Sequence, residues 1–384
     1  MPARLAPNAF SVALAKLRAD RVPLIDLTIS NPTLAGIVYP SHILSALADP
    51  RAQTYAPDPF GSIAARQAVA RAARGAAGQI PYDRVVLTAS TSEAYALLFK
   101  LLCDPGAEVL VPQPSYPLFD LLTKLEGVKT GAYRLEYHAA WSIDRASLER
   151  ALSPDTRAIL VVSPNNPTGS FVRTADRDWL AGLAAERGLA VIADEVFADY
   201  PLAPRADASS FLGESRALTF VLGGLSKSAG LPQVKLGWMI ASGPDALVDT
   251  ALSRLEIICD TYLSVSTPVQ VAAPALIDAG GLVRLAIQAR LERNLSALRA
   301  KLAAAPAVDL LDPEAGWSAV LRVPATVSEE SLVLRLLERE HVVVHPGYFF
   351  DFPQEAFLVV SLLTPSAAFD DGIDRLLPAA AGPS

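Results

Sequence analysis

A lysine with small residues around it is the first candidate for chemistry in this sequence. Lys227 lies in the segment Gly223–Leu231, which reads GGLSKSAGL and follows an apolar run. A lysine amine can form a Schiff base with an aldehyde when burial or a neighbouring charge lowers its pKa. Small neighbours let a ligand approach that amine closely. For this segment taken alone, a solvated loop lysine is the competing interpretation.

An aspartate and an asparagine also follow apolar runs. Asp194 ends the run Leu189–Asp194, where a carboxylate costs free energy unless it is paired. A protonated pyridine nitrogen is a suitable partner, and a helix cap or a pair with an arginine is the alternative. Asn166 lies in the turn Ser163–Gly169, where its amide could meet an oxygen on a ring. The alternative is an ordinary Pro-Gly loop.

Six short apolar runs alternate with longer helical patterns in the middle of the chain. Runs that are apolar throughout predict a mainly parallel sheet covered by helices on both faces. Ligands of such sheets bind beyond the carboxyl ends of the strands, so the polar groups found there are expected to meet at one edge. The groups are Ser90–Glu93, Pro114–Pro117, Asn165–Gly169, Asp194 and Ser226–Lys227, and the runs are Val85–Thr88, Glu108–Pro112, Ala158–Ser163, Leu189–Asp194, Leu218–Gly223 and Val234–Ala241.

Beyond about Val271 the pattern changes to that of a smaller α+β domain. We divide the chain into a segment 1–45 that packs on the small domain, a large domain 46–270 and a small domain 271–384. The expected helices of the small domain are Leu282–Ala304, Glu329–Glu340 and Phe369–Leu377, and its expected strands are Ala319–Val323, His341–Val344 and Phe357–Leu363.

Composition and charge exclude several classes of function. A formal charge of −7 and a pI near 5.2 disfavour a nucleic-acid or anionic-membrane partner. No apolar run is long enough for a membrane span, and two cysteines are too few for a disulfide framework, so we expect a cytoplasmic protein. The four histidines lack a metal-ligand pattern, and no dinucleotide or phosphate-loop motif is present.

Three motifs in this order resemble the class I/II aminotransferase family. They are Asn166–Gly169 (NPTG), Asp194–Phe197 (DEVF) and Ser226–Lys227 with Gly230-Leu231 shortly after. The resemblance spans roughly Leu24 to Leu376. It implies an α/β protein of the fold-type I, pyridoxal 5′-phosphate-dependent class, similar to aspartate aminotransferase. Its large domain would hold a mainly parallel seven-stranded sheet, next to a smaller α+β domain.

The resemblance also implies a role for individual residues. Lys227 would hold the cofactor as a Schiff base and move a proton between substrate Cα and cofactor C4′. Asp194 would pair with the pyridine nitrogen, and Asn166 would bind the ring 3′-oxygen. Tyr116, otherwise a core tyrosine, would stack on the ring. The remaining expected contacts are Thr91, Ser92, Ser226 and Lys235 to the phosphate, Tyr55 to the phosphate of a neighbouring subunit, Phe197 beside the ring, and Asn31, Asn166 and Tyr116 to the substrate.

Four positions depart from the family pattern. Gly224 stands where a phosphate-binding serine is common, and Lys235 stands where an arginine is usual. Phe197 replaces a tyrosine, and the missing donor is expected to raise the pKa of the Schiff base. Val359 occupies the position of the arginine that binds the substrate α-carboxylate.

The loss at Val359 leaves two explanations. Either the substrate lacks a free α-carboxylate, or another group such as Asn166 or Arg21 binds it. The aromatic residues Tyr348–Phe350 and Trp317 favour a bulky or hydrophobic substrate, with core packing as the alternative.

The leading hypothesis is a homodimeric aminotransferase with shared active sites. It would act on an amino acid or related amine through Lys227, form pyridoxamine phosphate, and be reoxidised by a small oxo acceptor. The alternatives are another reaction of the same cofactor (C–S β-lyase, decarboxylase, racemase or biosynthetic cyclase) and a non-catalytic protein that binds pyridoxal phosphate.

Overall fold

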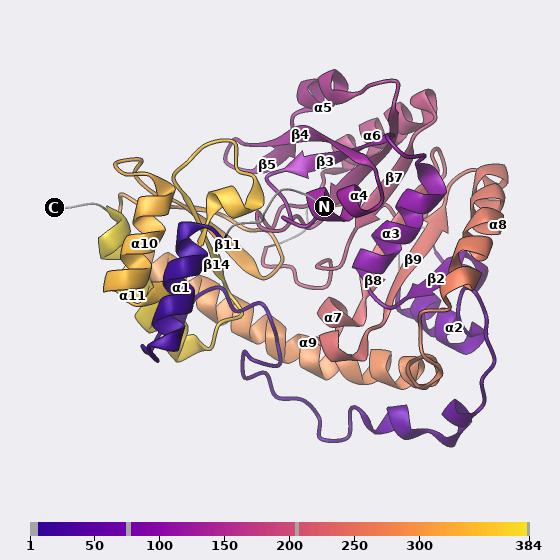
Figure 1. Ribbon diagram of the computed structural model, residues 1–384, viewed down its shortest axis with the longest axis horizontal. Helices are drawn as coiled ribbons and strands as arrows, with labels where there is room; N and C mark the ends of the chain where they lie inside the picture. Colours follow the sequence, from indigo (N-terminus) through magenta and orange to yellow (C-terminus); the bar gives the residue numbers. More distant parts are fainter. Residues whose placement is uncertain (1–6, 74–77, 204–206, 382–384) are drawn as a thin grey trace.

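An eight-stranded, mainly parallel sheet lies at the centre of the larger part of the molecule (Figure 1). The computed structural model describes residues 7–73, 78–203 and 207–381. The strand order is β2-β9-β8-β7-β6-β3-β4-β5. The strands are β2 (Val85–Thr88), β3 (Glu108–Gln113), β4 (Lys129–Tyr137), β5 (Trp141–Ile143), β6 (Thr156–Val162), β7 (Ala190–Asp194), β8 (Thr219–Gly224) and β9 (Gly237–Ser242).

Five neighbouring strands, from β8 to β4, run parallel, and β9 is antiparallel to both β8 and β2. The short β5 pairs antiparallel with β4 and adds an eighth strand to the expected seven. The strand expected from Val234 begins instead at Gly237. Its first residues form the 3-10 turn η4 (Pro232–Val234), and Lys235 follows with a φ of 58°, a left-handed conformation that no strand residue adopts.

Both faces of the large sheet are apolar, which is why its strands read as continuous hydrophobic runs. Along β6, Ala158 and Leu160 pack into one buried cluster, whereas Ile159 and Val161 pack into another on the opposite face. The helices of this part are α2 (Ile63–Ala72), α3 (Thr91–Leu102), α4 (Phe119–Leu125), α5 (Arg145–Ala151), α6 (Thr174–Arg187), α7 (Leu225–Ser228) and α8 (Asp245–Tyr262), with 3-10 turns η1 (Ser45–Ala48), η2 (Pro50–Gln53) and η3 (Tyr82–Arg84).

A four-stranded antiparallel sheet, in the order β10-β11-β14-β13, forms the smaller part. The N-terminal helix α1 (Ala9–Ala19) packs on α10 of this part (Figure 1). The strand β1 (Ile25–Asp26) pairs in parallel with β12. The elements are β10 (Asp309–Leu311), β11 (Ser318–Arg322), α10 (Glu329–Arg339), β12 (Val342–Val343), β13 (His345–Pro346), η5 (Gly347–Phe350), β14 (Phe357–Ser361) and α11 (Ser366–Ala381).

The long helix α9 (Thr267–Leu302) joins the two parts (Figure 1). It packs on α2 of the larger part and on α11 of the smaller one. By length and composition it is the one described helix that could cross a membrane, but Asp278 and Arg284 interrupt its apolar stretch. A single helix of this kind is weak support for a membrane span. Because α9 runs unbroken across residue 270, the division there remains a proposal.

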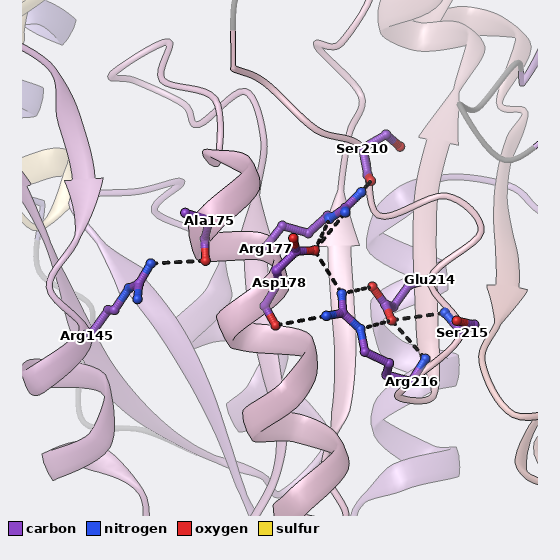
Figure 2. A network of polar contacts seen from close by, with 8 residues as sticks. All are labelled: Arg145, Ala175, Arg177, Asp178, Ser210, Glu214, Ser215 and Arg216. Atoms are coloured by element: carbon purple, nitrogen blue, oxygen red, sulfur yellow. Dashed lines mark hydrogen bonds and ion pairs between the residues drawn. The ribbon is translucent and has the colours of Figure 1, made fainter.

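An ionic network ties α6 to the segment that leads into β8 (Figure 2). Arg216 Nη2 lies 2.9 Å from Oδ1 of Asp178 and 2.7 Å from Oε2 of Glu214. The hydrogen bond from Arg216 holds the pKa of the buried Glu214 carboxyl below its ordinary value. The network thus lies just before β8, the strand that leads into the turn α7 with Lys227.

Candidate active site

Lys227 lies on the single turn α7, immediately after the carboxyl end of β8. Its Nζ is 4.7 Å from the ring centroid of Trp317 and 5.3 Å from that of Phe197. Burial lowers the pKa of the amine to about 8, and the nearby charge of Asp194 opposes that shift. A neutral amine is therefore accessible near physiological pH, as a nucleophile or a base requires.

Tyrosine hydroxyls hold the backbone of the lysine turn. Tyr200, which is fully buried, donates a hydrogen bond of 2.5 Å to the carbonyl oxygen of Lys227. Tyr39 donates one of 2.5 Å to the carbonyl oxygen of Gly230. Sequence reasoning missed both tyrosines. Only the position of Tyr200, six residues after Asp194, could have drawn attention to it.

Asp194 is the last residue of β7 and is buried. Its carboxylate accepts hydrogen bonds from the Tyr95 hydroxyl at 2.6 Å and from the Val196 amide at 3.1 Å. Burial raises the pKa of Asp194, while these two bonds and the charge of Lys227 lower it. Tyr95, on α3, is a third residue that sequence reasoning missed. Asp194 and Lys227 end neighbouring parallel strands, as the sheet-edge rule predicted.

Tyr116 and Asn166 lie on two loops that contact each other. The Asn165 amide donates a hydrogen bond of 3.2 Å to the Ser115 hydroxyl and so joins the loops. Burial and the charge of Asp194 raise the pKa of Tyr116. The Asn166 side chain makes no hydrogen bond to any residue that the structure describes, and its amide remains available to a ligand.

The N-terminus of α3 offers unpaired amides. Ser90 is the N-cap and accepts a hydrogen bond from the Glu93 amide at 3.1 Å. Glu93 in turn accepts one at 2.6 Å from the amide of Ala89, the residue before the N-cap. The amides of Thr91 and Ser92 donate to no other described residue. Free amides at the positive end of a helix dipole form a site for an anion such as a phosphate.

Ser226 and Lys235 differ in burial. Ser226 is half-buried in the first turn of α7, and Lys235 is exposed. A Cβ added at Gly224 would lie 3.2 Å from the carbonyl oxygen of Leu236, so a serine there needs that strand to shift. Within the described part of the chain, no hydrogen bond or ion pair joins Ser226 or Lys235 to Asp194 or Asn166.

Tyr55 and Asn31 are both exposed. Tyr55 has 72% of its surface accessible, and no described residue of the same chain engages its hydroxyl. The side-chain oxygen Oδ1 of Asn31 accepts hydrogen bonds from the amide and hydroxyl of Thr33, at 3.0 and 2.8 Å. Among the described residues, no hydrogen bond joins either Tyr55 or Asn31 to Lys227 of the same chain. Arg21 stands in a turn after α1 with a φ of 56° and is exposed.

Val359 lies in the centre of β14 and is 2% exposed. It pairs in register with Val320 and with His345. Its surroundings are aliphatic and aromatic, including Phe350 and Trp141. Among the residues that the structure describes, no cluster of three or more His, Cys, Asp or Glu side chains could hold a metal ion.

These residues fit pyridoxal phosphate. The fit rests on a buried amine of lowered pKa, a buried carboxylate on the adjacent strand and unpaired amides at a helix start. The indole nitrogen of Trp317, beside Lys227, is buried without a partner, so one more donor faces this region unused. Phe197 adds only an apolar ring.

Comparison with known proteins places these features in a family context. The family model "Aminotransferase class I and II" matches residues 22–376. An alanine aminotransferase of Mycobacterium tuberculosis (strain H37Rv) is 28% identical over 374 residues, which cover 94% of this chain and 86% of that protein. The glutamate-pyruvate aminotransferase AlaA of Escherichia coli (strain K12) is 26% identical over 359 residues, covering 90% and 88%.

Solved structures agree in fold. An alanine aminotransferase from Pyrococcus furiosus superposes with a TM-score of 0.85 at 25% identity, over 96% of this chain and 94% of that one. A Thermus thermophilus aspartate aminotransferase superposes with a TM-score of 0.83 at 22% identity, over 98% and 97%. At 22% identity, the likeness to the aspartate aminotransferase shows the fold alone.

Proposed function

This chain belongs to the aminotransferase class I and II family, and we propose that the residues around Lys227 transfer an amino group from a small donor to an oxo acceptor. It is a pyridoxal phosphate-dependent aminotransferase of fold type I. When bound, the cofactor supplies an aldehyde that joins the amine and a ring that withdraws electrons from the reacting carbon. The single observation that carries the assignment is the buried Lys227 amine beside Asp194.

Lys227 is both the point of covalent attachment and the base of the proposed reaction. Once an amino donor has displaced it, its Nζ is a free amine held among apolar rings. With a pKa of about 8, this amine takes a proton from the carbon that bears the amino group and then returns it. The hydrogen bond from Tyr200 to the Lys227 carbonyl keeps the turn in place while the side chain moves.

Asp194 holds a proton at the ring nitrogen. The Tyr95 hydroxyl and the Val196 amide both favour the charged carboxylate, against the cost of burial. A charged Asp194 stabilises a protonated nitrogen, which keeps the ring electron-withdrawing. The proposed pair is therefore a carboxylate with two protein donors and one ligand donor.

The remaining roles are proposed on position alone. Asn166 binds the ring oxygen, since its amide has no partner among the described residues, and Tyr116 stacks on the ring. Thr91 and Ser92 bind the phosphate through their amides. Ser226, Lys235 and Phe197 complete the surroundings of the cofactor, and Asn31 joins Asn166 and Tyr116 at the substrate.

We further propose a cytoplasmic homodimer in which the active sites are shared. The hydroxyl of the exposed Tyr55 makes no hydrogen bond to a described residue of its own chain, and it would reach the phosphate bound by a second copy. Both cysteines, Cys103 and Cys259, are free, in keeping with a reducing compartment. The division into segments 1–45, 46–270 and 271–384 is part of the same proposal.

A half-reaction experiment tests the function. Purified enzyme is loaded with pyridoxal phosphate and mixed with single amino donors while its visible absorbance is recorded. We expect a productive donor to remove the band and an oxo acceptor to restore it. Release of ammonia with no need for an acceptor would instead indicate a lyase and contradict transamination.

A further inference from the structure

Aromatic rings surround the amine of Lys227. Trp317 and Phe197 lie 4.7 and 5.3 Å from Nζ. Trp317 packs edge-on against Phe197 at 5.4 Å and against Tyr200 at 5.3 Å. All three aromatic side chains are buried, so they form a continuous wall on one side of the reacting amine.

A second apolar region lies between the two sheets, and we call it the junction cluster. Trp141 comes from β5 of the large sheet. Val320 and Val359 are paired with each other on the adjacent strands β11 and β14 of the small sheet. Leu358 and Val360 pack into the main core, so the alternation of the strand turns Val359 toward the cluster. The buried members of the junction cluster are Trp141, Leu311, Val320, Phe350, Phe352 and Val359.

The junction cluster touches the loops of the active site. The Ser115 amide donates a hydrogen bond of 3.0 Å to the carbonyl oxygen of Phe350, a member of the cluster. The Ser115 hydroxyl accepts one from the Asn165 amide at 3.2 Å. Tyr116 and Asn166 are the next residues along these two loops. The junction cluster therefore adjoins the loops that carry Tyr116 and Asn166.

Positive charge is scarce in this part of the molecule. Among the described residues, the charges that shift the pKa values of Lys227, Asp194 and Tyr116 belong to Lys227 and Asp194 themselves. Arg284 acts on Tyr200 of the aromatic wall, but it is paired with Asp199 at 3.3 Å. A carboxylate buried without a cation loses its hydration and gains no ion pair in return.

The unused polar groups in the two walls are neutral. The indole nitrogens of Trp317 and Trp141 are both buried and have no hydrogen-bond partner. An indole N–H is a donor without charge, and it suits a carbonyl or hydroxyl oxygen. An orphaned buried donor costs free energy until a ligand supplies an acceptor.

We propose that the substrate carries a neutral group, and no free carboxylate, on the carbon that bears the amino group. The class comprises amines with apolar or aromatic substituents and amino-acid amides. The inference rests on the proposed function, because it places the reacting carbon at Lys227. Of the two explanations for the valine at position 359, it chooses a substrate that lacks a free α-carboxylate.

Binding of an unreactive ligand pair tests the inference without catalysis. 3-Phenylpropionamide and 3-phenylpropionate have the same shape and differ in charge, and neither has an amino group. We expect the amide to bind the cofactor-loaded enzyme at least about tenfold more tightly, measured by quenching of tryptophan fluorescence. Equal binding, or tighter binding of the carboxylate, overturns the inference.

A matched pair of donors then separates this inference from the proposed function. L-phenylalaninamide should remove the cofactor band at least about tenfold faster than L-phenylalanine. If phenylalanine is faster, the inference fails and the transamination function stands. If neither donor acts, and enzyme loaded with pyridoxamine phosphate does not recover its band with any oxo compound, the proposed function fails as well.

A substitution at the junction cluster gives the reverse experiment. Val359→Arg should raise the affinity for 3-phenylpropionate at least about tenfold, since it adds a cation to an apolar wall. Val359→Leu, which adds bulk without charge, should leave the preference for the amide intact. Thermal melting checks that both variants fold. If Val359→Arg does not fold, the binding of 3-phenylpropionamide and 3-phenylpropionate to the wild-type enzyme tests the inference instead. An unchanged preference in folded Val359→Arg counts against the inference.

Discussion

The Tyr95 hydroxyl donates a hydrogen bond of 2.6 Å to Asp194, which lies 99 residues further along the chain. Tyr95 stands one helical turn after Thr91, whose amide is unpaired at the start of α3. The same helix thus carries the unpaired amide and the hydroxyl that binds the carboxylate. In the proposed site, α3 would therefore set the distance between the phosphate contacts and the carboxylate at the ring nitrogen before the ligand arrives.

Tyr95→Phe should weaken retention of pyridoxal phosphate about tenfold. The lost donor lets burial raise the pKa of Asp194 further, so less of the carboxylate is charged and the ring nitrogen loses its partner. The loss should grow as the pH falls toward the raised pKa of Asp194, because more of the carboxylate is then protonated. Dissociation constants at pH 6 and pH 8 measure this. Tyr133→Phe, which removes a buried hydrogen bond to Leu160 elsewhere in the sheet, should not alter them.

Phe197→Tyr should lower the midpoint of the spectrophotometric pH titration of the bound cofactor by about one unit. The new hydroxyl would stabilise the deprotonated ring oxygen, a task that the buried phenylalanine cannot perform. Phe197→Leu, which also lacks a donor, provides the control. A midpoint that is the same in the tyrosine variant and the wild type would contradict the assignment.

Lys227→Met should stabilise the enzyme stripped of cofactor. The folded-state pKa of about 8 lies below the ordinary 10.5, so the unfolded chain binds the proton more tightly. The cost of burying this amine is therefore full below pH 8 and disappears as the pH approaches 10.5. At pH 7 the 2.5-unit difference corresponds to at most about 3 kcal/mol in the free energy of unfolding.

Urea unfolding of the stripped enzyme at pH 7 and at pH 10.5 measures this difference. The gain from Lys227→Met should shrink between the two values. Lys129→Met, at a lysine whose side chain is 64% exposed, serves as the control and should change little. A gain that is constant with pH would mean that packing and not the charge is responsible.

Tyr200→Phe should lower kcat more than it changes KM. The variant removes the hydroxyl that binds the Lys227 carbonyl, which keeps the Gly230 amide at 3.2 Å as a donor, and a lost hydrogen bond costs about 1 kcal/mol of stability. The lysine turn then becomes less well oriented, which the circular dichroism of the bound cofactor should report. Tyr39→Phe, which frees the Gly230 carbonyl instead, should cost similar stability with a smaller effect on kcat. Equal effects on kcat would assign Tyr200 a structural role alone.

Mixing two inactive variants tests the shared active sites. In a homodimer that uses Tyr55 of one chain and Lys227 of the other, a hybrid of Tyr55→Ala and Lys227→Ala has one intact site and one doubly altered site. Random reassociation would restore about one quarter of the wild-type sites. If each chain builds its own site, every site carries a substitution and the mixture regains nothing.

The sequence by itself determined the strands that matter and the residues at their ends. Apolar runs identified β2, β3, β6, β7 and β8 to within two residues, because both faces of this sheet are buried. Lys227 and Asp194 then followed from their places at the ends of neighbouring strands. The family motifs are local and continuous in the chain, so they could be read without knowing the fold.

The tertiary structure alone decided which side chains meet these residues. Tyr95 reaches Asp194, and Tyr200 reaches the Lys227 carbonyl, across 99 and 27 positions of sequence. Hydrophobic periodicity predicts that such residues are buried, but a partner depends on how each helix is rotated and on the order of the strands. The same holds for Val359. The sequence marked the missing arginine, and only the packing of two sheets showed that an apolar cluster stands in its place.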